Sequence, residues 1–464
     1  MEKLSFQDNT FLLTETASQK HHITGLFIIK KPAGVGRVFV SDIVESLRTS
    51  GPVDNSFRSK LKHASPSVNQ EWVEDTGFDL DYHLRHYALP GPGNDQQLMR
   101  LANVIHSQGL DMNRPLWEYH IIDGIRGGRF AILGKQHHAT VDGAGSMKML
   151  DTFFSATKKT QTVVAPWSEK ANRKSKPYAP RSNTRRPIEQ ALASSWDSAK
   201  EAPDFAGLVG KQIGRMIKGE YHQGRFPFAA PRSMFNRELG PARNSLMIDL
   251  PLNEMKALGA ATGASINDVF LAVTGAALRR YLHESGELPP EPLVAMVPVS
   301  LKTKDDKAGN QLAVVHCQLA MGTPSSSSRL AGITLAMNEE KKFYKSLSRR
   351  MAKTYTNVMS LPQMAMMITG AADKVRPSYN LTVSNVRGPD KPRFLRGAEL
   401  ERFVPMSIVT EGNTLNITGI SYAGKFQICV LVCPKSVPNA EKIRDYIGVE
   451  FQRICKDVGR STGE

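Results

Sequence analysis

Two patterns of apolar positions alternate over the first 155 residues. The short apolar run at 25–29 (GLFII) is typical of a buried strand, whereas the spacing over 38–48 fits one face of an amphipathic helix. The same criteria predict helices over 97–109 and 145–154 and strands over 116–123 and 129–136, the strands being separated by the turn sequence IRGGR. Strands and helices that alternate in this way predict an α/β domain with a substantial sheet.

A second α/β unit is predicted to begin near Ser245. Helices are expected over 252–258 and 266–282, and a closing helix over 441–455. Strand-like segments lie at 293–299, 312–319, 379–383, 407–410, 415–422 and 425–432. Because the two halves resemble each other in element content, we expect two similar subdomains.

The stretch between these halves differs in composition. Residues 158–186 contain nine Lys or Arg and one acidic residue, Glu169, and prolines interrupt any regular structure. We interpret the stretch as a basic, exposed linker, followed by a helix or two over 188–216. The predicted organisation is an N-terminal subdomain (1–157), a linker with helices (158–244) and a C-terminal subdomain (245–464).

Composition narrows the class of protein. With 464 residues and 41% hydrophobic residues, the chain is neither wholly disordered nor a disulfide-stapled miniprotein. The net charge of +16 favours an acidic partner, namely nucleic acid, an anionic membrane or a phosphate-bearing small molecule. The four cysteines form no CxxC pair, so neither a zinc site nor a redox motif is predicted. No signal peptide is evident, and 354–372, the longest charge-free apolar stretch, is too polar for a spanning helix.

The densest chemical signal is the sequence QHHATVDG at 136–143. His137 and His138 follow a predicted strand, Asp142 comes four residues later, and Gly143 allows unusual backbone angles. A histidine at a strand end is well placed to act as a general base, because its pKa lies near neutrality. Asp142 is suited to fixing the loop or orienting an imidazole. Hydrogen-bonded core histidines are the competing interpretation. A metal site lacks a third evident ligand, and no GxSxG elbow for a serine nucleophile is present.

The same residues carry a resemblance to a known superfamily. HHATVDG matches the HHxxxDG pattern of the CoA-dependent acyltransferases. Four further segments occur in the expected order: RPLW at 114–117, SINDVFLA at 265–272, SNVRGP at 384–389 and LNIT at 415–418. Together they resemble the bacterial bifunctional wax ester synthase/diacylglycerol acyltransferase family over nearly the whole chain. The chain departs from the family pattern at Arg387, where the family usually has proline.

The resemblance implies two chloramphenicol-acetyltransferase-like α/β subdomains and no cofactor. It implies acyl-CoA as the donor and a diacylglycerol or fatty alcohol as the acceptor. His138 corresponds to the general base, and His137, Asp142 and Gly143 support the motif. Asn267 is a candidate donor to the oxyanion, or alternatively the cap of the helix that follows it. Trp117 is expected in the core or in a tunnel wall.

Two segments of the sequence are candidates for contact with lipid. The methionines at 359, 364, 366 and 367 suit an adaptable apolar groove, or equally a buried helix pair broken at Pro362. The basic linker favours a cytoplasmic protein attached peripherally to an anionic membrane or lipid inclusion. Nucleic acid is disfavoured because no recognition motif accompanies the charge. A condensation-type enzyme acting on carrier-protein thioesters and a non-catalytic lipid-binding protein are the alternatives.

Overall fold

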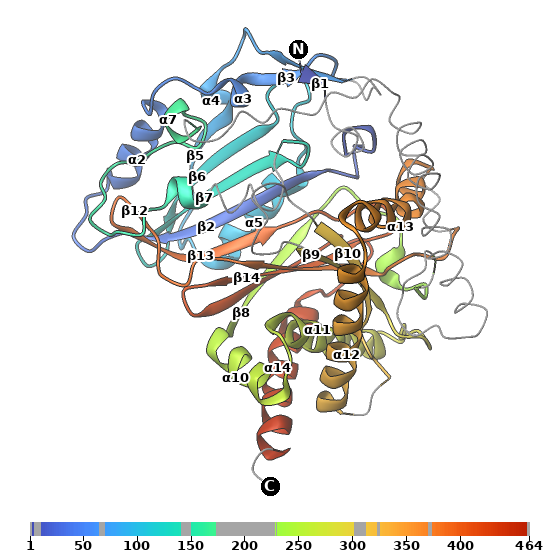
Figure 1. Cartoon of the computed structure of the whole chain (residues 1–464). Helices are drawn as coiled ribbons and strands as arrows, with labels where there is room; N and C mark the ends of the chain where they lie inside the picture. The colour runs from blue at the N-terminus through green and yellow to red at the C-terminus, as the bar shows by residue number, and fades with distance from the viewer. Residues whose placement is uncertain are drawn as a thin grey trace.

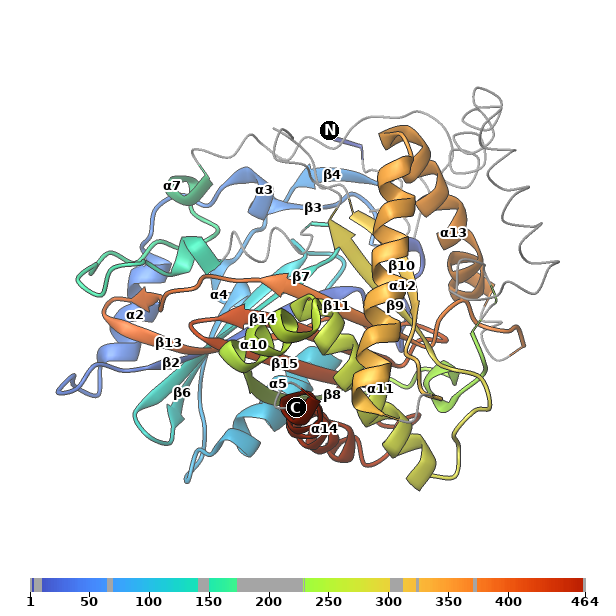
Figure 2. The same ribbon diagram turned by 60° about the horizontal axis from the view of Figure 1, so that its bottom comes forward.

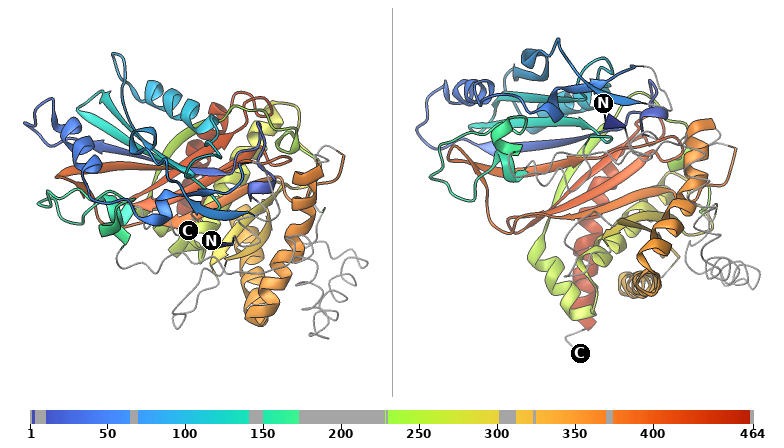
Figure 3. Two further views of the ribbon diagram at one scale, coloured as in Figure 1. Left: turned by 90° about the horizontal axis from the view of Figure 1, so that it is seen from above. Right: turned by 45° about the horizontal axis from the view of Figure 1, so that its top comes forward.

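Two six-stranded sheets and the helices around them form the described part of the chain (Figure 1). The computed structural model describes residues 2–3, 11–64, 70–140, 150–172, 228, 230–300, 312–322, 325–369 and 374–461. Residues 2–3 lie on the side of the first sheet, and the C-terminal helix ends on the opposite side (Figure 3).

The first sheet contains, in spatial order, β12 (Phe394–Leu395), β13 (Ala398–Met406), β2 (His22–Lys30), β7 (Arg129–His137), β6 (Trp117–Ile125) and β5 (Leu84–Ala88). Helix α2 (Phe39–Arg48) covers one face and helix α5 (Asp95–Ser107) the other. Helix α2 buries Phe39, Val40, Ile43, Val44 and Leu47, the spacing of one helical face. Asn94 and Gln97 form a capping box at the start of α5.

Short elements complete this half of the molecule. A three-stranded sheet joins β1 (Glu2–Lys3), β4 (Glu71–Glu74) and β3 (Ser59–Leu61). The short helices are α3 (Asn55–Arg58), α4 (Leu80–His83) and α7 (Glu169–Asn172). The predicted helix at 145–154 is described only from residue 150 onwards, where residues 150–153 are helical.

The second sheet contains, in spatial order, β10 (Leu312–Gln318), β9 (Val294–Ser300), β11 (Leu381–Arg387), β14 (Leu415–Tyr422), β15 (Lys425–Val432) and β8 (Asn244–Pro251). Four helices cover one face and enclose the largest apolar core: α10 (Leu252–Thr262), α11 (Ile266–Glu284), α12 (Ser326–Ser346) and α14 (Glu441–Ser461) (Figure 1). Helix α13 (Arg349–Thr369) lies beside α12 (Figure 2), and a 3₁₀ turn occupies Met234–Asn236.

The other face of the second sheet packs against the first half of the molecule. Cys429 and Leu431 of β15 share an apolar cluster with Leu26 and Ile28 of β2. The helix layer is therefore separated from the first sheet by the second sheet. This stacking confirms two sheet-containing α/β units.

Strands β12 and β13 correct the predicted division of the chain. The boundary at residue 245 assigned them to the C-terminal subdomain, but they extend the first sheet at its β2 edge. The reason is packing, since the Phe403 ring stacks on that of Phe27 with centroids 4.6 Å apart. The strand predicted at 407–410 is also wrong, because the strand ends at Met406.

The predicted linker is exposed at its start, at residues 158–162, but not throughout. Trp167 is 1% exposed, and its ring stacks on that of Trp117 at a centroid distance of 5.3 Å. Residues 165–168 are all buried, so this stretch belongs to the first apolar core. The basic residues from Arg173 to Arg186, and the helices predicted at 188–216, lie outside the described residues.

Helix α13 contains the methionines on which the lipid groove was predicted, and the groove itself stays a prediction. The helix runs through Pro362, so the expected break there is wrong. Met359 and Met366 are buried, with Met359 in the large core.

No single helix in the described ranges is long and apolar enough to cross a membrane. Helices α10 and α11 qualify only as a pair bent by 100°, and most of α11 is buried in the core. The four cysteines are free thiols, three of them buried.

Candidate active site

Two pairs of adjacent histidines meet where β2 begins and β7 ends. The antiparallel register places His22 opposite His137. The backbone N–H of His138 donates to the carbonyl oxygen of His21 at 2.7 Å. The chain turns immediately after the strand, because both the backbone N–H and the hydroxyl of Thr140 donate to the His137 carbonyl, at 2.9 and 2.8 Å. The position of His138 is thus fixed by its backbone.

His137 is fully buried, and both of its ring nitrogens have partners. Its Nδ1 accepts from the backbone N–H of Ala139 at 3.1 Å, and its Nε2 lies 3.3 Å from Oε2 of Glu15. Because Nδ1 accepts a hydrogen bond, the proton of the neutral ring lies on Nε2 and is donated to Glu15. These contacts tie the ring to Glu15 and to the backbone of the loop, and the supporting role of His137 stays a prediction.

His138 has a different environment. Among His21, His22, His137 and His138, it alone has appreciable exposed surface. Its ring packs against that of Phe11, with centroids 4.3 Å apart and planes inclined by 35°. His138 therefore combines a fixed backbone with a side chain that is only partly buried, which suits a general base.

His21 remains neutral beside it. Burial, together with the neighbouring His137 and His138, lowers the pKa of His21 to about 3. The ring Nε2 is 2.9 Å from the hydroxyl of Thr14, and the backbone N–H donates to Glu15 at 2.8 Å. At neutral pH, therefore, His21 does not exchange protons with the solvent or with a substrate.

The segment 11–21, which contains Phe11, Glu15 and His21, is the part of the site that sequence reasoning missed. This segment also contacts the second half of the chain: the Gln19 side chain accepts from the backbone N–H of Glu411 at 2.7 Å, and Arg243 donates to the Ser18 carbonyl at 2.5 Å. The signal that could have revealed it is His21–His22, the other adjacent histidine pair in the sequence.

A buried lysine anchors α5 below the histidines. The Nζ of Lys135 donates to the carbonyl oxygens of Ile105, Gln108 and Gly109, at 3.1, 2.7 and 3.3 Å, at the C-terminal end of α5. A cation is favourable at that end of a helix dipole. Burial lowers the pKa of Lys135 to about 8, although Glu118, 3.7 Å away, opposes the shift. These contacts hold α5 against the strand that carries His138.

The structure does not bring Asn267 to His138. Asn267 lies in the first turn of α11, in the helix layer beyond the second sheet. The capping alternative is also wrong, because Ser265 is the N-cap. Its hydroxyl accepts from the backbone N–H of Asp268, and the Asp268 carboxylate accepts from the backbone N–H of Ser265. Asp142 and Gly143 lie outside the described residues.

The remaining motif residues have structural surroundings. The indole N–H of buried Trp117 donates to the carbonyl of Phe57 at 2.7 Å, as expected of a core residue. Arg387 is exposed and pairs with Asp390 at 3.3 Å, so replacing the family's proline there disturbs no packed side chain. Gly388 must be glycine, since a Cβ would lie 2.3 Å from the Ser421 carbonyl oxygen.

Within the described ranges, no three His, Cys, Asp or Glu side chains are grouped to hold a metal ion.

Two family profiles match the chain. The wax ester synthase/diacylglycerol acyltransferase catalytic domain matches residues 4–270, and the WS/DGAT C-terminal domain matches residues 308–455. A probable diacylglycerol O-acyltransferase of Mycobacterium tuberculosis is 32% identical over 465 residues, covering 99% of this chain and all of the relative. The O-acyltransferase WSD of Acinetobacter baylyi is 32% identical over 447 residues, covering 96% and 95%.

Solved structures agree with these matches. The wax ester synthase/diacylglycerol acyltransferase of Marinobacter aquaeolei superposes with a TM-score of 0.76 at 28% identity, over 98% of this chain and 100% of that one. The first condensation domain of the CDA synthetase gives a TM-score of 0.56 at 15% identity, over 98% and 96%, which shows the shared fold alone. The predicted fold of two acyltransferase-like subdomains is confirmed.

Proposed function

The chain belongs to the wax ester synthase/diacylglycerol acyltransferase family, and on that premise we propose that it moves a long-chain acyl group from acyl-CoA to a hydroxyl. The acceptor is a diacylglycerol or a fatty alcohol, so the product is a triacylglycerol or a wax ester. The observation that carries this assignment to a residue is the environment of His138, the partly buried histidine that follows β7 within the HHATVDG motif.

In the proposed mechanism His138 acts as the general base. Its ring takes the proton of the acceptor hydroxyl while the oxygen attacks the thioester carbonyl carbon. The tetrahedral intermediate then collapses, the carbon–sulfur bond breaks, and the CoA thiolate recovers the proton from His138. The acyl group passes directly to the acceptor without a covalent enzyme intermediate, which suits a chain that has no GxSxG nucleophile motif.

The surrounding residues support this role by holding His138 in place. His137 is occupied by Glu15 and Ala139, and His21 is neutral with a depressed pKa. Of the four histidines, His138 is therefore the one suited to exchange a proton with a substrate. The place of Asn267 in the helix layer of the second sheet argues against its predicted role as donor to the oxyanion.

The test is an acyl-transfer assay with purified protein. Palmitoyl-CoA is supplied with hexadecanol or with a diacylglycerol, thiol release is followed, and products are separated by lipid class. We expect thiol release that depends on the acceptor and yields a wax ester or triacylglycerol. Thiol release that ignores the acceptor, or its absence with both acceptors, would contradict the proposal.

The same assay separates the alternatives. A condensation-type enzyme would prefer an acyl group carried on a carrier protein to the same group on CoA. The condensation domains share the fold at 11–15% identity, which carries no information on the donor. A non-catalytic lipid-binding protein would retain palmitoyl-CoA without releasing thiol.

We also propose that the protein is cytoplasmic and associates peripherally with an anionic membrane or the surface of a lipid inclusion. The nine basic residues between 158 and 186 support this, since attraction to an anionic surface contributes about 1 kcal/mol per basic residue. The test neutralises five of them: Arg173, Lys174, Lys176, Arg185 and Arg186. We expect weaker flotation with anionic liposomes at low salt; unchanged partitioning would contradict the role of the segment.

A further inference from the structure

Four loops meet at the end of the first sheet that is opposite to the histidines. There β2 ends at Lys30, β7 begins at Arg129 and β13 begins at Ala398, next to the short strand β12 and the start of α2 (Figure 1). We call this end the sheet tip, and its loops comprise residues 30–38, 125–129, 155–162 and 391–397. Strand β7 runs from Arg129 to His137, so at roughly 3.3 Å per residue the sheet tip lies about 30 Å from His138.

Contacts between backbones join the four loops into one surface. The N–H of Lys31 donates to the carbonyl oxygen of Gly128 at 2.9 Å, which joins the first loop to the second. Gly397 of the fourth loop packs against the other two. A Cβ at this glycine would lie 3.4 Å from the carbonyl oxygen of Lys158 and 3.8 Å from the ring of Pro32. The sheet tip is therefore continuous across all four loops.

The sheet tip carries an excess of positive charge. Its four loops contain ten Lys or Arg and no Asp or Glu. Four of the ten pair with carboxylates of neighbouring elements, namely Lys31, Arg129, Arg393 and Arg396. The other six are exposed and form no ion pair with the carboxylates that the structure describes: Lys30, Arg37, Arg126, Lys158, Lys159 and Lys391. Glu399 of β13 stands opposite Lys30 in the register, and counting it still leaves five cations in excess.

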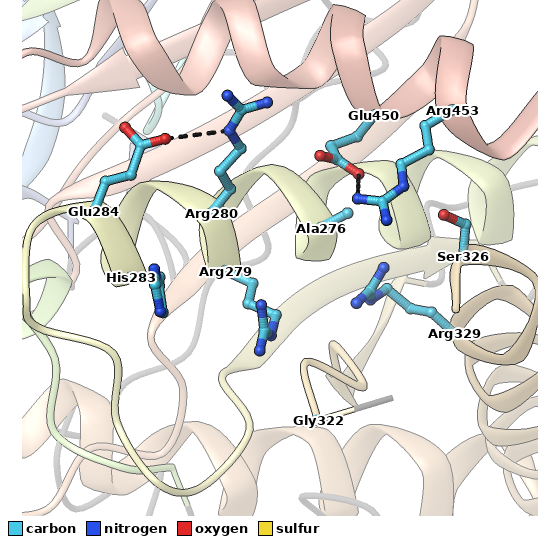
Figure 4. Close-up of a pocket in the computed structure, with 10 residues that line it drawn as sticks. All are labelled: Ala276, Arg279, Arg280, His283, Glu284, Gly322, Ser326, Arg329, Glu450 and Arg453. Carbon is cyan, nitrogen blue, oxygen red and sulfur yellow. Dashed lines mark hydrogen bonds and ion pairs between the residues drawn. The ribbon is translucent and has the colours of Figure 1, made fainter. Parts of the chain in front are cut away.

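A second group of cations, in the helix layer of the other sheet, is arranged differently. The hollow between α11, α12 and α14 has carboxylates among its arginines (Figure 4). Arg280 lies 3.2 Å from Glu284, and Arg453 lies 3.9 Å from Glu450. The loops of the sheet tip contain no carboxylate, so their positive charge faces the solvent over a broader surface.

Two apolar side chains lie among the cations of the sheet tip. Val35 and Val38 are 36% and 63% exposed, on either side of Arg37. Six large hydrophobic side chains are exposed among the described residues, and this loop contains two of them. Basic and exposed apolar side chains together suit a lipid surface, because the cations attract anionic headgroups and the apolar groups enter the acyl boundary. The phosphates of a nucleic acid would account for the cations but not for the valines.

We propose that the sheet tip is the surface through which the protein docks on an anionic lipid layer. Arg37, Arg126 and Lys159 attract the lipid phosphates, and Val35 and Val38 enter the boundary below the headgroups. This rests on the peripheral association with an anionic surface and names the face responsible for it. The stretch of basic residues that begins at 158 leaves the first half of the molecule from this same face.

The test measures flotation of the full-length protein at low salt with vesicles of phosphatidylcholine that contain phosphatidylglycerol or lack it. The tip variant is Arg37→Gln/Arg126→Gln/Lys159→Gln. The control variant removes the same charge from exposed positions of α11 and α12: Arg279→Gln/Lys342→Gln/Lys345→Gln. We expect the tip variant to bind phosphatidylglycerol vesicles roughly 10- to 100-fold more weakly than the wild type, and the control variant to bind as the wild type does. Thermal unfolding verifies that each variant is folded.

Val35→Ser/Val38→Ser tests the apolar part of the surface while keeping every charge. We expect its binding to the same vesicles to weaken roughly 3- to 10-fold, with the salt dependence of the wild type retained. Binding equal to that of the wild type would overturn the insertion of the valines.

The outcomes separate this proposal from the association on which it rests. If the wild type does not float with phosphatidylglycerol vesicles, the association itself is refuted. If the wild type and the folded tip variant float equally, the association stands but the sheet tip is not its surface. Equal losses in the tip and control variants would show that net charge alone is responsible, and the proposal fails. Tighter binding to a DNA duplex than to vesicles, lost in the tip variant, would assign the surface to nucleic acid instead.

Discussion

The two sheets share an architecture but differ in what their helix-covered faces bury. The face of the second sheet under α11 is apolar, with Ala295, Ile417 and Phe426 among its residues. The face of the first sheet under α5 is apolar at one end, with Leu26 and Leu133, and polar at the other. At that other end it buries Thr24, Glu118, His120 and Lys135 beside His137.

This difference shows that the first sheet buries polar side chains at the end that positions His138. Buried polar groups cost free energy unless they are paired, and each of these side chains has at least one partner. The hydroxyl of Thr24 contacts His106, Glu118 contacts His120 at 3.1 Å, and Lys135 holds the end of α5. The polar end coincides with the end of β7 that carries His138. We infer that the first sheet positions the reacting imidazole, while the second provides stability.

The largest expected effect is on turnover, at His138. Replacing His138 with alanine removes the general base, and we expect the acyl-transfer rate to fall roughly 10²- to 10⁴-fold while the thermal unfolding curve changes little. The measurement is the rate of acceptor-dependent thiol release per folded molecule. Substantial turnover by a folded His138→Ala protein would refute the assignment.

His137→Ala is the matched comparison for that variant. His137 is fully buried and bonded to Glu15 and Ala139, so its loss should destabilise the loop and weaken turnover less than His138→Ala does. Equal losses in the two variants, with equal stability, would remove the distinction between a reacting and a supporting histidine.

Substitutions in the core of the second sheet should change the free energy of unfolding rather than turnover. Phe270 is fully buried in α11 and packs edge-on against Phe426, with centroids 5.0 Å apart. We expect Phe270→Ala to lower the free energy of unfolding by about 3–5 kcal/mol, while turnover per folded molecule stays near that of the wild type. Leu335→Ala, at an exposed position of α12, is the control and should change stability by less than about 0.5 kcal/mol. A turnover loss in folded Phe270→Ala would show that the second sheet does more than support.

Sequence patterns predicted what depends on local periodicity or on a contiguous motif. The strand ending at His137, the amphipathic helix α2 and the long helix α11 were found in this way. Long-range pairing was not visible, so the insertion of β13 beside β2 and the contacts of Phe11 and Glu15 with the motif histidines were missed. The layer in which Asn267 lies was not visible either, because a motif gives no information on which layer its helix occupies. The oxyanion donor therefore cannot be read from motif order alone.

Lys135 gives a smaller, pH-dependent test of the polar end. Its pKa is about 8 in the folded protein against 10.5 ordinarily, so between these values the unfolded chain holds a proton that the folded protein has released. Unfolding then takes up a proton, and raising the pH through this window stabilises the fold by at most about 1.4 kcal/mol per pH unit. Denaturant titrations at pH 7 to 10 should show this contribution in the wild type and its loss in Lys135→Met. Identical pH profiles for the two proteins would mean that Lys135 is not held in a buried site.

The smallest effect separates capping from catalysis at the start of α11. Ser265 caps this helix through the backbone N–H of Asp268, so Ser265→Ala should lower the free energy of unfolding by about 1 kcal/mol. Asn267 neither caps the helix nor lies beside His138, so Asn267→Ala should change stability less than Ser265→Ala and leave kcat close to that of the wild type. Denaturant unfolding and acyl-transfer kinetics on both variants provide the measurement. A large fall in kcat in folded Asn267→Ala, with KM little changed, would restore Asn267 as an oxyanion donor and require the helix layer to reach the reacting carbonyl. In that case the division between a positioning sheet and a supporting sheet would not hold.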